Sequence, residues 1–182
     1  MLICLYGIFH NGLFYDFKVR LEVRKGYFMK RGISFKLPNE YGTFLGDILK
    51  PIDISSFSWR IGEVETYQII NNELCEALFP EDKEIIEGIA LKKLLENNSY
   101  YVIFADLQAY PQGEITEINT YEEFAEGNCE LVLLVVDSYY ATIYCKDKAK
   151  LELLFKNAQD YAFEDVEYVT NENDTRTGLS VW

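Results

Sequence analysis

Two apolar stretches of the sequence each end in an aspartate. Residues 102–105 precede Asp106, and residues 134–136 precede Asp137. If the two strands were adjacent and parallel, both carboxylates would emerge at one sheet edge and could hold a divalent cation on oxygen ligands. That arrangement would suit a metal-dependent, carboxylate-based hydrolase or a nucleotide-handling enzyme. Aspartate is also common in turns after strands, so a structural role for Asp137 at a hairpin turn is the simpler interpretation.

Other catalytic chemistries find little support in the sequence. The one histidine, His10, lies in an N-terminal segment that we expect to be foreign to the domain. Without it, His-based acid–base catalysis and His-ligated zinc are excluded together. The four cysteines form no Cys-x-x-Cys pair and lie in apolar stretches, which is typical of small buried side chains in a reducing compartment. No glycine-rich loop carries the Lys-Ser or Lys-Thr of a phosphate site, and we expect no cofactor and no bound metal.

Surface recognition is the class of function that we expect, in a domain without enzymatic activity that acts through protein–protein contact; the carboxylate-dependent enzyme is the alternative. Large aromatic residues stand among carboxylates in two places, where they could form an acidic patch with an aromatic anchor for a basic protein partner. These candidate binding residues are Trp59 with Glu63 and Glu65, and Tyr121 with Glu122, Glu123 and Glu126. Immunity proteins, small inhibitors and regulators often have such a composition, although ordinary solvated faces would explain the same residues.

Net charge narrows the choice of partners. The 182 residues include 17 basic and 30 acidic side chains, a formal charge of −13. A surface of this sign repels phosphates, so nucleic acid is an unfavourable ligand, whereas a basic protein is electrostatically favoured. The longest apolar run covers residues 131–136, far short of the roughly 20 residues of a membrane span. We therefore expect a cytoplasmic protein that binds neither membrane nor nucleic acid.

Residues 1–28 differ in charge from the rest of the chain. They hold four basic and two acidic residues, whereas the remainder holds 13 basic and 28 acidic ones. Residues 24–26 can be encoded by a purine run that resembles a bacterial ribosome-binding site, just before Met29. We predict that residues 1–28 are an upstream, non-native extension and that translation starts at Met29. A genuine N-terminal strand pair is the alternative, and the sequence leaves both open.

Residues 29–182 are expected to form a single α+β domain with a mixed, largely antiparallel sheet and about four helices. Residues 131–136 are apolar throughout, which predicts a strand buried on both faces and paired with residues 141–145 in a hairpin. Further predicted strands cover residues 33–37, 57–61, 66–70, 74–79, 101–105 and 163–169, with a turn at residues 62–63. Predicted helices follow residues 38–39, 80–82, 120 and 147; the second is divided at Gly88, and Thr120 with Glu123 has the spacing of a capping box at the start of the third. Residues 163–169 alternate apolar and acidic side chains, which is typical of an edge strand.

Several runs resemble a bacterial family called domain of unknown function 2691, which occurs in spore-forming Gram-positive bacteria. The runs are residues 29–35, 38–42, 49–53 and 131–146, and the similarity covers residues 29–182. The resemblance implies common ancestry and a cytosolic setting. It brings no activity, cofactor or site residue with it.

Overall fold

The computed structural model describes residues 29–80, 82–111 and 113–181. The predicted N-terminal extension, with His10, lies outside these residues. The helical elements are α2 (Phe44–Leu49), the 3₁₀ turn η1 (Ile54–Ser56), α3 (Gly88–Asn97), α4 (Tyr121–Glu126) and α5 (Lys148–Asp160). The strands are β1 (Lys30–Lys36), β2 (Ser58–Ile70), β3 (Glu73–Ala77), β4 (Ile85–Glu87), β5 (Tyr100–Tyr110), β6 (Leu131–Val136), β7 (Tyr140–Cys145) and β8 (Glu164–Thr170).

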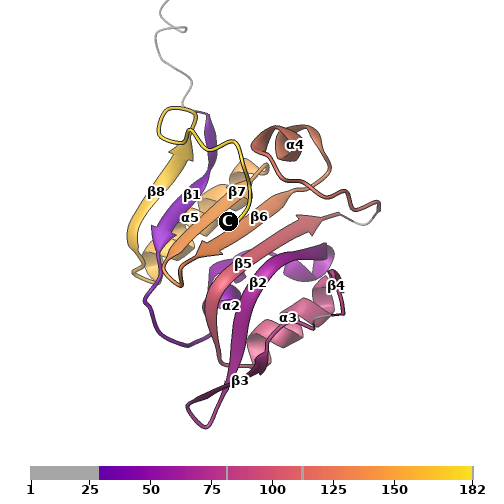
Figure 1. Cartoon of the computed structure of the whole chain (residues 1–182). Helices are drawn as coiled ribbons and strands as arrows, with labels where there is room; N and C mark the ends of the chain where they lie inside the picture. Colours follow the sequence, from indigo (N-terminus) through magenta and orange to yellow (C-terminus); the bar gives the residue numbers. More distant parts are fainter. Residues whose placement is uncertain (1–28, 81, 112, 182) are drawn as a thin grey trace, which may run out of the picture.

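The eight strands form one sheet in the order β3-β2-β5-β6-β7-β1-β8, and β4 also pairs with β2 (Figure 1). This confirms the predicted single α+β domain with four helices. Every strand pair among the described residues is antiparallel, so the parallel component allowed by a mixed sheet does not occur there. Two of these antiparallel pairs, β2–β3 and β6–β7, are hairpins, in which a tight turn makes the neighbours antiparallel.

Strand β6 is buried on both faces, as its apolar sequence predicted. Leu131, Leu133 and Val135 belong to one hydrophobic core, and Val132 and Leu134 belong to a second core on the opposite face. The turn to β7 places Asp137 and Ser138 at φ of 54° and 59°. Two left-handed residues match the right-handed twist of the flanking strands, so this hairpin is confirmed together with its turn.

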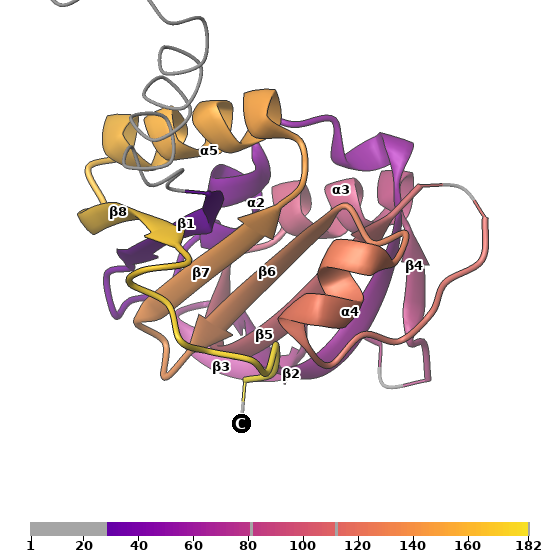
Figure 2. The same ribbon diagram turned by 90° about the horizontal axis from the view of Figure 1, so that it is seen from above.

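Different elements cover the two hydrophobic cores on the two faces of the sheet (Figure 2). Helices α2, α3 and α5 lie over one face of the sheet, and α4 with the C-terminal tail, residues 171–181, lies over the other. The tail is held by a backbone bond of 2.8 Å from Leu179 N to Asn119 O. Both faces of the central strands are thereby removed from solvent, which leaves the two lateral edges of the sheet exposed.

The predicted turn at residues 62–63 is wrong. Strand β2 runs through this point for 13 residues and shifts its register against β5 between Ile61 and Val64. Such a shift is a β-bulge, which bends and twists a strand without ending it. A side chain at Gly62 would collide with the Asp106 carboxylate, so glycine lets β5 approach closely here.

The predicted helix after residue 80 begins later than expected, at Gly88. Residues 85–87 instead form β4, which pairs with residues 58–60 of β2. The backbone of Gly88 lies directly against the carbonyls of Ile54 and Phe57, and Gly88 N donates to Phe57 O at 2.9 Å. Because β2 offers unpaired backbone groups at this point, edge pairing prevails over the helical spacing of the isoleucines. The helix predicted from residues 38–39 is likewise shorter and covers residues 44–49.

The C-terminal half agrees with the expectations from the sequence. Thr120 and Glu123 form the predicted capping box at the start of α4. Asp147 caps α5 by accepting bonds from the backbone of Ala149 and Lys150. Strand β8 lies at a sheet edge, as its alternating acidic pattern indicated.

Candidate functional site

Asp106 lies in the middle of β5 and is buried on the face covered by α4. Gln108 Nε2 donates to both carboxylate oxygens at 3.2 Å and also reaches Ile118 O at 3.3 Å. Burial raises the pKa of Asp106 to about 6, and the bonds from Gln108 offset part of this rise. The carboxylate lies against Gly62, where any side chain would collide with it.

Asp137 does not meet Asp106. Strands β5 and β6 are antiparallel, and Asp106 pairs with Leu134, so Asp137 lies three residues further along β6, about 10 Å away along the strand. Asp137 is exposed in the hairpin turn. The parallel arrangement required by the metal hypothesis is not formed by these strands. Among the described residues, no group of three or more His, Cys, Asp or Glu side chains is placed to hold a metal ion.

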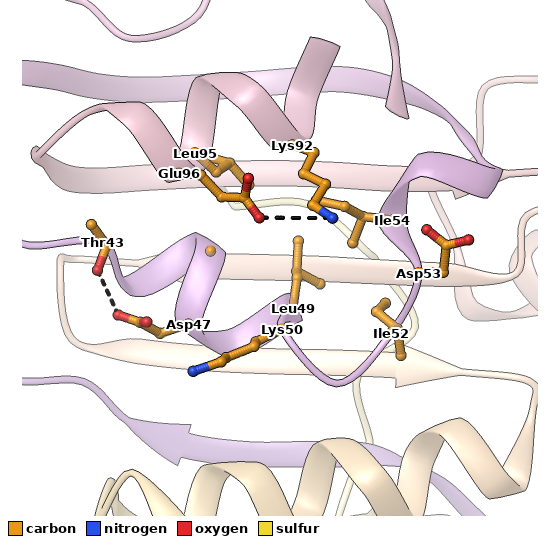
Figure 3. Close-up of a pocket in the computed structure, with 11 residues that line it drawn as sticks. Thr43, Asp47, Leu49, Lys50, Ile52, Asp53, Ile54, Lys92, Leu95 and Glu96 are labelled. Carbon is orange, nitrogen blue, oxygen red and sulfur yellow. Dashed lines mark hydrogen bonds and ion pairs between the residues drawn. The ribbon is translucent and has the colours of Figure 1, made fainter. Parts of the chain in front are cut away.

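A pocket of about 430 Å³ opens on the helix-covered face, between α2, η1 and α3 (Figure 3). Its charged side chains already have partners. Lys92 Nζ lies 3.9 Å from a Glu96 carboxylate oxygen, and Thr43 Oγ1 donates to Asp47 at 2.7 Å. Asp53 accepts a bond from the Ser55 hydroxyl, which lowers the pKa of Asp53. A ligand here would have to replace these bonds, so the pocket is a weak candidate for a polar ligand.

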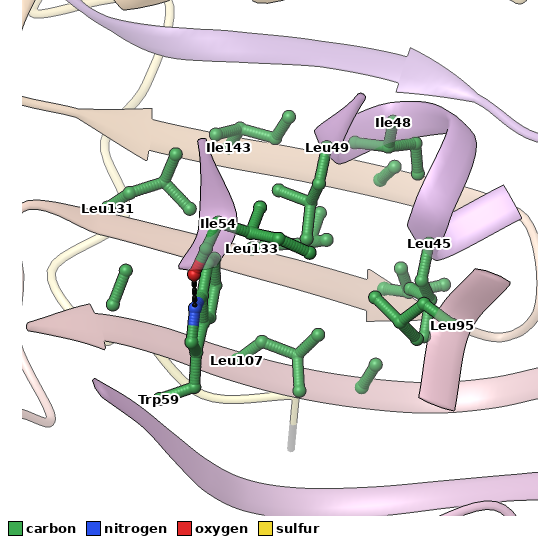
Figure 4. Packing of buried hydrophobic residues seen from close by; sticks show 14 of the residues in the cluster. Leu45, Ile48, Leu49, Ile54, Trp59, Leu95, Leu107, Leu131, Leu133 and Ile143 are labelled. Carbon is green, nitrogen blue, oxygen red and sulfur yellow. Dashed lines mark hydrogen bonds between the residues drawn. The ribbon is translucent and has the colours of Figure 1, made fainter. Parts of the chain in front are cut away.

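Trp59 is buried in the core, and its prediction as an exposed anchor is wrong. Its side chain is 0% exposed, and its indole Nε1 donates to Ile54 O at 2.9 Å (Figure 4). The alternation along β2 carries Trp59 to the face packed against the helices, where the backbone of η1 satisfies its polar group. Glu63 is exposed and Glu65 is half-buried on the same strand, so the carboxylates of this patch remain at the surface without the indole.

Tyr121 is likewise part of the packing. Its ring lies 5.6 Å from that of Tyr144 and 5.9 Å from that of Phe124, and the Arg31 guanidinium lies 4.3 Å from its centroid. Burial raises the pKa of Tyr121. Glu123 is used in the capping box, where two backbone N–H bonds lower its pKa. The remaining members of this predicted patch, Glu122 and Glu126, are exposed on α4.

A second acidic surface is larger than the sequence alone indicated. Residues 62–87 contain eight acidic residues and one basic residue. They form the outer side of β2 together with β3 and β4, both of which pair with β2. We call this surface the acidic edge; its described carboxylates are Glu63, Glu65, Glu73, Glu76, Asp82, Glu84 and Glu87. Within the described part of the chain, none of the seven forms an ion pair.

The acidic edge also exposes apolar side chains and an open strand. All five residues of β3 are exposed, and the β2–β3 hairpin extends beyond the body of the domain (Figure 1). Ile70 and Leu74 near its tip are 53% and 61% exposed, and Ile85 and Ile89 at the other end are 48% and 61% exposed. Charged and apolar side chains beside a strand with one open side are the elements with which proteins bind extended segments.

A pocket interrupts this edge where β3 ends and β4 has not yet begun. It has a volume of about 370 Å³ and is lined by Thr66, Tyr67, Glu65 and Glu84, among others. Sequence reasoning missed it because the Gly62 bulge resembles a turn. The signal in the sequence that marks its surroundings is the charge density of residues 62–87, with eight acidic residues and one basic residue.

Among the cysteines, Cys129 and Cys145 are buried as predicted, and Cys75 on β3 is exposed, contrary to the prediction. Burial raises the pKa of the Cys129 thiol to about 12 and that of Cys145 to about 11. Neither buried thiol is therefore ionised near neutral pH. Of the helices in the described part of the chain, none has the length and hydrophobicity that crossing a membrane requires.

Comparison with known proteins places the chain in a family. The model of the family described as "Protein of unknown function (DUF2691)" matches residues 30–180. The chain belongs to this family. It is similar to "Uncharacterized protein YncE" of Bacillus subtilis (strain 168), with 47% identity over 154 residues, which are 84% of this chain and 100% of that protein. No solved structure matches the chain. The predicted resemblance is confirmed.

Proposed function

We propose that this member of the family is a cytoplasmic, non-enzymatic interaction domain of the immunity, inhibitor or regulator type, which binds a basic segment of another protein along the acidic edge. The observation that carries the proposal is the unpaired charge of this edge. Seven described carboxylates lie beside an open strand, and none of them forms an ion pair within the described chain.

Coulombic repulsion among these groups is a cost to the isolated domain, although solvent and salt reduce it. A segment rich in lysine and arginine would relieve the repulsion on binding, and complementary charge would also accelerate its association. The exposed apolar residues Ile70, Leu74 and Ile85 supply contact area that charge alone does not. An extended segment could pair its backbone with the open side of β3.

Fluorescence anisotropy with a labelled peptide tests the proposal. The probe has about six residues, the length of a typical strand, with lysine and threonine in alternation and one central arginine. A peptide with glutamate at the basic positions is the control probe. We expect the basic probe to bind the full chain and to lose affinity when salt rises from about 50 mM to about 300 mM.

A matched pair of variants locates the binding. The first variant loses three charges of the acidic edge through Glu73→Gln, Glu76→Gln and Glu87→Gln. The second loses three exposed charges near and on α4 through Glu114→Gln, Glu122→Gln and Glu126→Gln. We expect the first variant to weaken binding at least about tenfold and the second less than about twofold, since opposite charges attract mainly over a Debye length. Equal losses in both variants, or no binding of the basic probe by the unaltered chain, would refute the proposal.

A further inference from the structure

The pocket in the acidic edge lies between the two strands that pair with the outer side of β2. At one end Leu78 N donates to Thr66 O at 2.9 Å, and at the other Ile61 N donates to Glu84 O at 2.7 Å. Between these bonds, Val64 and Glu65 pair with β5 on their inner side, and residues 62–63 form the bulge. On their outer side, residues 62–65 make no backbone hydrogen bond within the described chain. The pocket therefore exposes backbone groups of β2 to a ligand.

Thr66 supplies a second polar group without a partner. Its side chain is 3% exposed, and among the described residues its Oγ1 has no hydrogen-bond partner. Buried hydroxyls are normally hydrogen-bonded, because an unsatisfied one loses its bonds to water without replacement. Thr66 is one of the residues that line the pocket, and its hydroxyl would gain a partner from a ligand whose donor reached it there.

The charge and shape of the lining favour a flat cation. Glu65 and Glu84 contribute carboxylates, and Lys83 is the one cation among the described lining residues. Tyr67 OH donates to Glu65 at 3.2 Å, and the charge of Glu65 raises the pKa of Tyr67. Apolar lining comes from Val64 and Phe79, among others. The pocket thus combines acceptors with surfaces on which a planar group can stack.

We infer that this pocket is the subsite for one arginine side chain of the basic segment, an inference that rests on the proposed function. A guanidinium carries five donors in a rigid plane, and it is weakly hydrated, so its faces pack on aromatic and aliphatic groups. It can bond carboxylate, hydroxyl and backbone carbonyl oxygens at once. A lysine ammonium is compact and strongly hydrated, and it has no flat face to pack on the lining.

Two peptides that differ in a single side chain, arginine or citrulline, test the inference. The first is the lysine–threonine probe with its central arginine, and the second carries citrulline, which has nearly the same shape without the charge. Both are titrated into the unaltered chain, the pocket variant Glu65→Gln with Glu84→Gln, and the single variant Thr66→Val. We expect citrulline to weaken binding about tenfold in the unaltered chain and less than about twofold in the pocket variant, a coupling that a double-mutant cycle isolates.

Thr66→Val provides an independent readout, because it keeps the volume of the side chain and removes the acceptor. We expect it to weaken the arginine peptide at least about threefold; the citrulline peptide, which keeps N–H donors, should lose affinity in the same direction. A citrulline penalty of the same size in the unaltered chain and the pocket variant would overturn the inference. The proposed function would survive that result if the triple variant Glu73→Gln, Glu76→Gln and Glu87→Gln still bound the basic probe more weakly than the unaltered chain does. Binding of neither peptide to the unaltered chain would overturn both.

Discussion

The two lateral edges of the sheet both carry acidic strands, but the surroundings of their carboxylates differ. On β8, Asp165 lies 2.7 Å from Lys36 Nζ, and Glu167 and Glu164 accept hydroxyl bonds from Ser34 and Tyr139. At the acidic edge, the seven described carboxylates have no ion-pair partner in the described chain, and among them Glu65 accepts a hydroxyl bond, from Tyr67. The three carboxylates of β8 all have a partner within the domain, whereas most of those at the acidic edge do not.

Acidic residues on a sheet edge discourage edge-to-edge aggregation, and this explanation suffices for β8. Next to β8, Lys30 also pairs with Glu152 at 2.6 Å and lies over the Tyr168 ring, and the bond to Glu152 raises the pKa of Lys30. The acidic edge has more carboxylates, exposed apolar residues and a pocket with a buried hydroxyl. An acidic edge thus becomes a candidate interface when its charges and polar groups lack partners of their own.

Substitution of one glycine beside each edge should show how rigid the two regions are. In Gly32→Ala the new methyl group would collide with the Ile143 carbonyl across the β1–β7 ladder, where backbone cannot yield. In Gly62→Ala it would collide with the Asp106 carboxylate, which is a side chain. We expect Gly32→Ala to lower the free energy of unfolding by about 3 kcal/mol and Gly62→Ala to lower it by about 1–2 kcal/mol, which is the usual range for overpacking. Urea unfolding measures both, and an equal or reversed order would contradict this difference in rigidity.

Asp106, packed on the bulge of the acidic edge, should make stability depend on pH. Its pKa is about 6 in the folded protein against 3.8 when exposed, so the folded state binds the proton more readily. The stabilisation from protonation is therefore complete below about pH 3.8 and is lost as pH rises through about 6. A gap of about two pH units between the folded and unfolded pKa of one carboxyl corresponds to about 3 kcal/mol.

Asp106→Asn should remove this dependence, because the amide keeps an acceptor for Gln108 and does not titrate. The difference in unfolding free energy between variant and unaltered chain should move in favour of the variant by about 2–3 kcal/mol from pH 4 to pH 7.5. Urea unfolding across this range measures it. A difference that stays constant with pH would mean that Asp106 is not penalised by burial.

Thr66→Val should stabilise the isolated domain, the smallest of the three effects. The substitution keeps the shape of the side chain and removes a buried hydroxyl that has no partner in the described chain. We expect a gain of about 1 kcal/mol in the free energy of unfolding. Ser34→Ala, which removes a hydroxyl that bonds to Glu167, is the control at the other edge and should not stabilise. Destabilisation by Thr66→Val would show that its hydroxyl is satisfied.

The parts of the fold that the sequence predicted are those decided by local pattern. The continuous apolar run of β6 predicted burial on both faces, and the spacing of Thr120 and Glu123 predicted the cap of α4. The errors lie around β2, where tertiary contacts decide. Gly62 resembles a turn residue until Asp106 is known to lie against it, and residues 85–87 resemble a helix until β2 offers them an edge.

The candidate site was predicted only in part for the same reason. Of the first predicted patch, Glu63 is exposed and Glu65 is half-buried, but Trp59 beside them alternates into the core. Whether Asp106 and Asp137 meet depends on strand direction, and whether a carboxylate has a partner depends on residues far away in sequence. Neither property follows from local spacing.

Backbone amide shifts in ¹⁵N-labelled full-length protein, recorded during titration with the arginine-containing peptide, would locate the binding surface residue by residue. We predict that the largest shifts fall within residues 62–87, with Gly62, Thr66 and the amides of β3 foremost. We predict small shifts in β8, whose carboxylates have partners, and in α4, which does not line the pocket of the acidic edge. Shifts centred on β8 or α4, or spread evenly over all acidic surfaces, would contradict the proposal that the acidic edge binds the basic segment.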